Sequence, residues 1–257
     1  MALLELNGVT LSFSGLRALS DVGFKVDERE IVGLIGPNGA GKSTLINCVS
    51  RLYRPERGSI RFRGEDLVGR NAPDVAAMGI RRTFQNLELF REASVRENVT
   101  LGLAYRYRTS VLGDFLDLPS ARRMRREADA EASEIIQSLG LNEVADAIVS
   151  ELSYGLQKSV EMARALAGRP ALMLLDEPAA GMNPEESRRV AETVRRLRDE
   201  KGISILLVEH DMRVVMSACD RIVVLDHGEM IAEGTPAQIR NSPAVIKAYL
   251  GEEEDHA

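Results

Sequence analysis

Gly36-Pro-Asn-Gly-Ala-Gly-Lys-Ser-Thr44 is the stretch of this sequence that decides the fold. It follows an apolar run, Ile31–Ile35, and it opens an amphipathic stretch, so it lies where a strand turns into a helix. Its three glycines let the backbone bring several N–H groups around an anion, and the start of the following helix adds partial positive charge. We therefore expect this segment, here called the phosphate loop, to hold a polyphosphate.

The side chains at the end of the phosphate loop suit a nucleoside triphosphate and its metal. Lys42 is a mobile positive charge that can reach the β- and γ-phosphates, and Ser43 offers a hydroxyl to Mg²⁺. Thr44 supplies a further hydroxyl near the α-phosphate. A turn that only connects two elements is the alternative, but it rarely matches this pattern by chance. The predicted nucleotide-binding residues of the loop are Asn38, Gly39, Ala40, Gly41, Lys42, Ser43 and Thr44.

The composition limits the classes of protein to which this chain can belong. With 257 residues, 44% of them hydrophobic, it has enough apolar side chains for a full core. The net charge of −6 and a pI near 5.3 argue against a nucleic-acid binder that works through bulk positive charge. Cys48 and Cys219 lack CxxC spacing, which fits a reduced, cytosolic chain. No apolar run has the length of a membrane span, and the first residues do not resemble a signal peptide.

The first quarter of the chain reads as a sheet followed by a helix. Short β-like runs between Leu3 and Phe62 alternate with turns and predict an antiparallel sheet. A helix is expected over residues 43–52, with an apolar stripe that would pack on the core sheet. The stripe consists of Leu45, Ile46, Val49 and Leu52.

The rest of the chain reads as an α/β core with a helical insertion. The charge-rich segment 95–152 is expected to be a helical subdomain, inserted into a core that comprises residues 1–94 and 153–257. We interpret its basic run, Arg122–Arg126, as a solvated helix face, with contact to anionic lipid or to a partner as the alternative. Continuous apolar runs predict parallel strands at Ala171–Leu175, Ile203–Val208 and Ile222–Leu225.

Capping signals define the starts of two helices. Asn183 is expected to cap one helix, with Pro184 at its first position and Gly202 after its end. Ser153 is expected to cap another, and Gly155 lets the exposed N–H groups there approach an anion closely. The sequence therefore predicts a second anion site, for which a plain N-capped helix is the alternative.

Two adjacent carboxylates, Asp176 and Glu177, follow the apolar run Ala171–Leu175. Parallel strands deliver their carboxyl ends to one edge of a sheet, so this pair is expected beside the phosphate loop. Successive strand residues point to opposite sides, which allows different roles. We assign Asp176 to Mg²⁺ and Glu177 to polarising the water that attacks the γ-phosphate. A solvated acidic pair at a strand end is the alternative.

Two further polar residues complete the candidate catalytic set of Lys42, Gln85, Glu177 and His210. His210 follows the next core strand, where a neutral imidazole can donate a hydrogen bond to the γ-phosphate. Gln85, in Arg82-Thr-Phe-Gln-Asn86, can offer its amide oxygen to Mg²⁺ or to the water. Taken alone, a histidine after a strand is usually structural, and a glutamine in a polar stretch is ordinarily a loop residue.

Together these motifs are similar to the full motif set of the ATPase subunits of ABC transporters, over nearly the whole chain. The shared motifs are the phosphate loop, Gln85, Leu152-Ser-Tyr-Gly155, Leu174-Leu-Asp-Glu-Pro178, Ala180-Gly-Met-Asn183 and His210. The resemblance implies an α/β fold: a P-loop NTPase (RecA-like) core with an N-terminal antiparallel β-subdomain and an inserted α-helical subdomain.

The same resemblance implies how ATP and Mg²⁺ would be bound. Two subunits would pair head to tail around two ATP molecules, each held between the phosphate loop of one subunit and the Ser153–Gly155 segment of the other. Phe13 falls where the family stacks an aromatic ring on adenine, with a buried core phenylalanine as the alternative. Leu156 stands where the family usually carries Gln or Glu, and this departure bears on ribose contacts and on coupling across the dimer.

Finer features resemble the ATPases of branched-chain amino-acid importers. They include Leu89-Phe-Arg91, the long insertion Gly102–Ser120, Val208-Glu-His-Asp-Met212 and the ending Ala248-Tyr-Leu-Gly251. The resemblance implies an ATP hydrolase that drives solute uptake from the cytoplasmic face of the plasma membrane. The implied partners are integral membrane permease subunits, a second copy or a sister ATPase, and a periplasmic or extracellular solute-binding protein, but no nucleic acid. Arg81 and Arg82 are expected at the permease interface.

Three other functions share some of these features. The urea and lipopolysaccharide systems share parts of the same features, so the transported solute stays open among them. A soluble ABC ATPase acting on nucleic acid or ribosomes usually carries two cassettes or a long coiled coil, and this chain has neither. Glu177 argues against a scaffold that binds ATP but hydrolyses it poorly.

Overall fold

The computed structural model describes residues 1–84, 87–104, 106–107 and 118–254. The chain divides into two units: Met1–Arg82 together with Ala171–Ala257, and Thr83–Pro170. Within the described residues, no helix combines the length and the apolar character needed to cross a bilayer. The candidate functional residues fall in both units: the phosphate loop, Asp176, Glu177 and His210 in the first, and Ser153 and Gly155 in the second.

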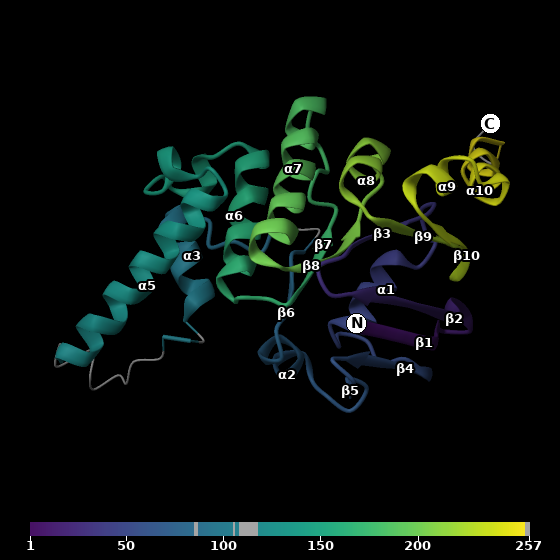
Figure 1. The fold of residues 1–257 in the computed structure, drawn as a ribbon, viewed down its shortest axis with the longest axis horizontal. Helices are drawn as coiled ribbons and strands as arrows, with labels where there is room; N and C mark the ends of the chain where they lie inside the picture. Colours follow the sequence, from purple (N-terminus) through teal and green to yellow (C-terminus); the bar gives the residue numbers. More distant parts are fainter. Residues whose placement is uncertain (85–86, 105, 108–117, 255–257) are drawn as a thin grey trace. The chain divides into compact units, whose positions relative to one another are not determined.

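A parallel sheet carries the phosphate loop in the first unit (Figure 1). In the part of the chain that the structure describes, its strand order is β10-β9-β3-β8-β7-β6, and only β10 runs antiparallel to its neighbour. The strands are β3 (Ile31–Ile35), β6 (Ile80–Arg82), β7 (Leu172–Asp176), β8 (Ser204–Val208), β9 (Arg221–Asp226) and β10 (Glu229–Gly234). The three apolar runs after the insertion are thus confirmed as parallel strands, whereas β6 was not predicted because its three residues include two arginines.

The N-terminal strands form the predicted antiparallel sheet, with the order β2-β1-β4-β5. The inclusion of the run Ile31–Ile35 in that sheet is wrong, because β3 pairs in parallel with β8 and β9. Its strands are β1 (Ala2–Phe13), β2 (Leu16–Asp27), β4 (Arg57–Phe62) and β5 (Glu65–Asp66). The residues before Ser14 form one long strand, β1, whose pairing with β2 has register shifts. Side chains from this sheet, among them Leu4, Leu6 and Phe62, are fully buried and share one core cluster with Leu174 and Leu206 of the parallel sheet.

Helices accompany the strands of the first unit: α1 (Lys42–Val49), α2 (Ala72–Ala77), α7 (Pro184–Lys201), α8 (Met212–Ala218), α9 (Pro236–Arg240) and α10 (Pro243–Glu254). Helix α1 is shorter than expected, and the placement of Leu52 on its buried stripe is wrong, since this side chain is 52% exposed. The reason is local: Arg51 adopts a positive φ of 62°, and the N–H of Leu52 turns back to the carbonyl of Asn47.

The helical unit spans Thr83–Pro170 and is wider than the segment 95–152 expected from the sequence. Its helices are α3 (Val95–Leu103), α5 (Pro119–Ser138), the 3₁₀ turns η1 (Asn142–Val144) and η2 (Val149–Glu151), and α6 (Tyr154–Ala167). Gly102 permits close packing of α3 on α6, because a Cβ there would lie 2.5 Å from the carbonyl oxygen of Arg164. Helix α6 therefore belongs with the other helices of this unit.

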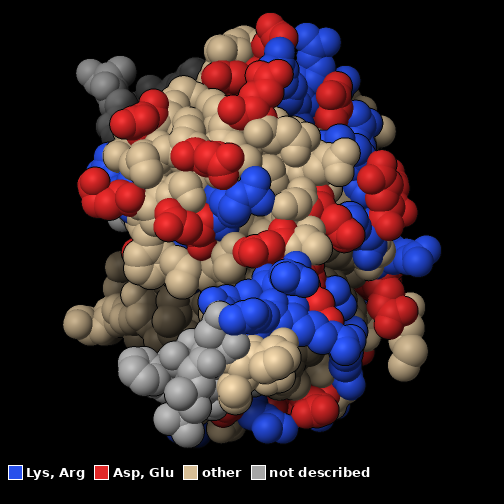
Figure 2. Space-filling model, turned by 90° about the vertical axis from the view of Figure 1, so that its left-hand side faces the viewer, with Lys and Arg blue, Asp and Glu red and all other residues tan. Residues whose placement is uncertain are grey.

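The basic run near the start of α5 has the properties of a solvated helix face. The four arginines of Arg122–Arg126 are all exposed. The Nε atom of Arg123 lies 2.8 Å from Oε1 of Glu127, one helical turn later. Figure 2 views the molecule from the left-hand side of Figure 1 and shows basic and acidic side chains mixed over that face. This mixture supports the interpretation of a solvated surface.

We expect both thiols to be unreactive in the folded protein. Burial raises the pKa of Cys48 to about 11 and that of Cys219 to about 12. At pH 8 roughly one Cys48 side chain in a thousand would then be a thiolate, the form that reacts with Ellman's reagent. Native protein should release no thionitrobenzoate within minutes, and protein in guanidinium chloride should release two equivalents. Rapid release of one equivalent from the native protein would contradict this burial.

Candidate functional site

The backbone of the phosphate loop requires glycine at two closely packed positions. Gly36 has a φ of +151°, and a Cβ there would lie 2.0 Å from the carbonyl oxygen of Leu225. Gly41 has a φ of +98°, and its Cβ would lie 2.6 Å from the carbonyl oxygen of Ala18. The loop is thus packed closely against the backbone of Leu225 and Ala18, while its tip, which includes Asn38, remains exposed. The loop therefore presents its backbone to solvent in the way an anion site needs.

The first turn of α1 is suited to a negatively charged ligand. Its N-cap is Gly41, which has no side-chain oxygen, and its first turn contains no acidic residue. The Nζ atom of Lys42 donates to the carbonyl oxygens of Gly36 at 2.6 Å and Pro37 at 2.7 Å, so the ammonium group lies over the loop. Ser43 is exposed and Thr44 is half-buried. Lys42 and Ser43 thus lie together at the start of α1, and their roles in binding phosphate and metal stay a prediction.

Asp176 ends β7 in a buried position, with an exposed fraction of 1%. Its Oδ2 atom lies 2.9 Å from Nη2 of Arg82, which comes from the neighbouring strand β6. The guanidinium also donates to Oδ1 of Asn47 on α1, at 2.5 Å. A buried carboxylate requires a charged or hydrogen-bonding partner, and Arg82 supplies it. The expectation that Arg82 lies at the permease interface is therefore wrong, because its side chain is only 10% exposed.

Glu177 and His210 lie together at the ends of adjacent strands. His210 follows β8, and its Nδ1 atom lies 3.8 Å from Oε1 of Glu177. Glu177 is a non-glycine residue in the left-handed region, with a φ of 49°, which costs on the order of 1–3 kcal/mol. Such strain is frequent where a side chain must be held for function. The structure thus brings together the two residues that the sequence analysis assigned to the γ-phosphate.

A buried carboxylate that the sequence analysis missed lies next to His210. The side chain of Glu209 is fully buried, and its oxygens accept three backbone N–H groups: Ala179 at 2.7 Å, His210 at 3.1 Å and Asp211 at 3.3 Å. Burial raises the pKa of Glu209, and these hydrogen bonds oppose that rise. The signal in the sequence was a charged residue placed directly after the apolar run of β8.

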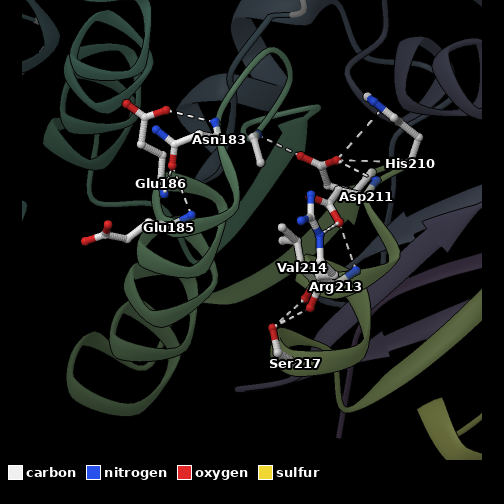
Figure 3. Close-up of polar contacts among 10 residues, drawn as sticks. Asn183, Glu185, Glu186, His210, Asp211, Arg213, Val214 and Ser217 are labelled. Carbon is white, nitrogen blue, oxygen red and sulfur yellow. Dashed lines mark hydrogen bonds and ion pairs between the residues drawn. The ribbon is translucent and has the colours of Figure 1, made fainter.

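Two helices begin with capping residues close to this part of the chain, Asn183 for α7 and Asp211 for α8 (Figure 3). The Oδ1 atom of Asn183 accepts the N–H groups of Glu185 and Glu186, both at 3.0 Å, which confirms the predicted cap of α7. Asp211 caps α8 by accepting the N–H of Arg213 at 2.9 Å. The loop from Glu177 to Asn183 is therefore held at a rigid helix start.

The second anion site of the sequence analysis lies in the helical unit. Oγ of Ser153 accepts the N–H of Leu156 at 3.4 Å, so the predicted cap of α6 is confirmed. Ser153 itself is exposed and Gly155 is half-buried. The first turn of α6 contains no acidic residue. This helix start can accept an anion, although its role stays a prediction.

A buried ion pair on α6 holds the backbone just before Gln85. Nζ of Lys158 donates to the carbonyl oxygen of Phe84 at 3.1 Å, and Oε1 of Glu161 accepts the N–H of Phe84 at 2.9 Å. Both charged side chains are at most 3% exposed. The sequence analysis missed this pair. Lysine and glutamate three positions apart on a helix are usually a pair on the surface, so nothing in the spacing indicated burial. Gln85 itself lies outside the described residues.

Phe13 is available for contact with a ligand. Its side chain is 42% exposed, which excludes the alternative of a buried core phenylalanine. It packs edge to face against Tyr53, with the ring centroids 5.2 Å apart. An exposed, supported ring of this kind suits stacking on a base.

The donor set fits a nucleoside triphosphate with a magnesium ion. The loop glycines expose backbone N–H groups for phosphate, and Lys42 adds a positive charge beside them. The hydroxyl of Ser43 and the carboxylate of Asp176 are hard oxygen ligands, which Mg²⁺ prefers. The parallel sheet, its phosphate loop and the acidic strand end thus define a P-loop nucleotide-binding protein.

Comparison with known families agrees with this class. A model described as ABC transporter matches residues 19–180, and a second, described as branched-chain amino acid ATP-binding cassette transporter, matches residues 229–255. This chain belongs to the ABC transporter family, as an ATP-binding cassette. The resemblance to this family seen in the sequence, and the fold class inferred from it, are therefore confirmed.

Several named relatives match over nearly their full length. The high-affinity branched-chain amino acid transport ATP-binding protein BraF of Pseudomonas aeruginosa is 43% identical, over 97% of this chain and 98% of its own. LivG of Escherichia coli, of the same description, is 44% identical over the same shares. The lipopolysaccharide export system ATP-binding protein LptB of Haemophilus influenzae is 35% identical over 98% and 99%.

Solved structures share the fold as well. The ADP conformation of MJ1267, an ATP-binding cassette of an ABC transporter, superposes with a TM-score of 0.85 at 31% identity, over 98% of this chain and 99% of that one. A dimeric, post-hydrolysis structure of the cassette MJ0796 bound to ADP and phosphate has a TM-score of 0.76 at 26% identity, over 91% and 98%.

Proposed function

We propose that this chain hydrolyses ATP to drive the import of branched-chain amino acids. The proposal of ATP hydrolysis depends on one observation: the phosphate loop, Glu177 and His210 all follow neighbouring parallel strands of one sheet. Glu177 and His210, at the ends of β7 and β8, have side chains 3.8 Å apart. The choice of solute is supported by the match of residues 229–255 and by 43–44% identity to branched-chain importer subunits.

The residues of the first unit take distinct parts in the proposed reaction. Backbone N–H groups of Asn38–Thr44 and the ammonium of Lys42 bind the phosphates, and Phe13 stacks on the base. Glu177 orients the attacking water and accepts its proton, while His210 donates a hydrogen bond to the γ-phosphate. Ser43 and Asp176 would hold Mg²⁺, with Gln85 as a further ligand, and the ion would neutralise charge on the phosphates.

A second subunit completes the proposed site. Ser153 and Gly155 would contact the γ-phosphate bound to the partner, because a helix start without acidic residues favours an anion. The partner would be a second copy or a sister ATPase. Membrane permease subunits would bind this protein on the cytoplasmic side, where closure of the two ATPase subunits around ATP would be transmitted to them. A solute-binding protein would deliver the solute from outside.

Reconstitution tests both parts of the proposal. We expect the chain, purified with the permease subunits encoded beside it and embedded in proteoliposomes, to hydrolyse Mg-ATP at a rate that rises when binding protein loaded with leucine, isoleucine or valine is added. Labelled leucine should accumulate, and labelled urea should not. Hydrolysis stimulated by urea alone, or by lipopolysaccharide alone, would reassign the solute. Absence of any ATP hydrolysis would overturn the enzymatic role as well.

A further inference from the structure

Two loops of the candidate site are attached to the two oxygens of a single buried carboxylate. Oε1 of Glu209 accepts the N–H of Ala179, in the loop that follows Glu177. Oε2 accepts the N–H groups of His210 and Asp211, in the turn that starts α8. Figure 3 shows His210 and Asp211 in the turn that starts α8, and Asn183 at the end of the other loop. The connection spans thirty positions of sequence.

The same loop is attached to β8 at a second point. The N–H of Glu177 donates to the carbonyl oxygen of Val208 at 2.9 Å. Val208 is the last residue of β8, and Glu209 follows it. These two consecutive residues therefore bind the two ends of the turn from Glu177 to Ala179. Within that turn Glu177 keeps its strained φ of 49°. A strained conformation persists only where its surroundings hold it, and these two hydrogen bonds do so.

The hydrogen bond from Ala179 to Glu209 is buried, whereas those from His210 and Asp211 are partly buried. Glu209 has an exposed fraction of 0% and Ala179 one of 4%. Burying a carboxylate is costly unless it is well hydrogen-bonded, and here three N–H groups bind it. If the carboxylate were removed, the N–H of Ala179 would lose its acceptor in a buried place, and the N–H groups of His210 and Asp211 would lose theirs in a partly buried one, so the loops would have to rearrange.

We propose that Glu209 is a positioning residue, which holds the Glu177 loop and the His210 turn in one arrangement and thereby sets the rate of the hydrolytic step. It does not touch the nucleotide. Both loops are hydrogen-bonded to the two oxygens of this one carboxylate. A displacement of the loop Ala179–Asn183 therefore also displaces His210. This inference rests on the roles proposed above for Glu177 and His210, and it adds a residue through which both are controlled.

The test compares two substitutions of Glu209 with a matched control. In Glu209→Ala both loops lose their acceptor, and we expect kcat to fall by about a hundredfold, since a displacement of about 1 Å in a site has an effect of that size. The KM for ATP should stay within about twofold, because the phosphate loop is untouched. Glu209→Gln keeps the shape and one acceptor oxygen, so its kcat should lie between those of Glu209→Ala and the wild type.

Asp220→Asn is the control, because Oδ2 of Asp220 also accepts a backbone N–H, that of Ile31 at 2.8 Å, at the opposite end of β3 from the phosphate loop. It should lower the melting temperature without lowering kcat. Equal losses of kcat in the Asp220 and Glu209 variants would overturn the inference, as would a Glu209→Ala protein with kcat within twofold of wild type. If Glu209→Ala does not fold, a kcat for Glu209→Gln equal to wild type overturns it.

Glu177→Gln, measured in parallel, separates this inference from the proposed function. Wild-type turnover in Glu177→Gln would refute the assigned roles themselves. Loss of turnover in Glu177→Gln, together with unchanged kcat in the Glu209 variants, would refute only the positioning role of Glu209.

Discussion

Replacing Glu177 with glutamine is expected to lower ATP turnover by about a thousandfold while leaving ATP binding intact. The amide has the same size and can still bind a water molecule, but it cannot accept the proton that the attacking water loses. His210 is unchanged in this variant and, in the proposed reaction, would still donate its hydrogen bond to the γ-phosphate. ATP should then stay bound without being cleaved, and the two-subunit complex should persist. Phosphate release measures turnover, and light scattering coupled to gel filtration in Mg-ATP measures the complex.

The matched control is Glu185→Gln, on the first turn of α7. Glu185 is an exposed carboxylate near the same loop, and it pairs only with Arg189 in the described structure, at 2.6 Å. Glu185→Gln removes one negative charge, as Glu177→Gln does, but it should leave ATP turnover within about twofold of the wild-type rate. Unchanged hydrolysis in Glu177→Gln would exclude Glu177 as the base, and an equal loss in both variants would indicate a general charge effect.

Replacing Lys42 with alanine is expected to weaken ATP binding by about a hundredfold, which corresponds to about 3 kcal/mol. The ammonium is only slightly exposed and lies 2.6 and 2.7 Å from two carbonyl oxygens of the phosphate loop. The substitution therefore removes both the charge that meets the β- and γ-phosphates and a contact that orders the loop. Titration with a fluorescent ATP analogue measures the affinity directly.

Lys201→Ala serves as the control for Lys42, because Lys201 is exposed in the last turn of α7. It should bind ATP as the wild type does. Melting temperatures of both variants distinguish a lost ligand contact from a disordered loop. Normal affinity in a folded Lys42→Ala protein would count against the phosphate-loop assignment.

Much of the fold could be predicted from the sequence, because the signals were local. The buried strand β3 and the loop after it follow from a run of apolar residues beside three glycines. The cap of α7 follows from Asn183, whose side chain accepts N–H groups within one turn, and from Pro184, which has no N–H of its own to satisfy at the first helical position. The hairpin between β9 and β10 follows from His227 and Gly228, which both adopt positive φ.

The errors arose where distant parts of the chain decide a local feature. Strand β6 is short and charged, and it is a strand only because β7 pairs with it in parallel. By contrast, the extension of the α1 stripe to Leu52 was a local error, because the positive φ of Arg51 ends the turn after Val49. The helical unit begins at Thr83, since α6 binds the backbone of Phe84 through Glu161, far along the chain.

The sequence alone determined which chemical groups are present and which short segments carry them: a glycine-rich loop before a helix, a pair of carboxylates after a strand and a histidine after the next. Only the tertiary structure decided how buried charges are paired. Arg82 with Asp176, Ala179 with Glu209 and Phe84 with Glu161 join residues 94, 30 and 77 positions apart. A buried charge bonds to whatever the strand order and the helix packing bring beside it, and that order is a property of the whole fold.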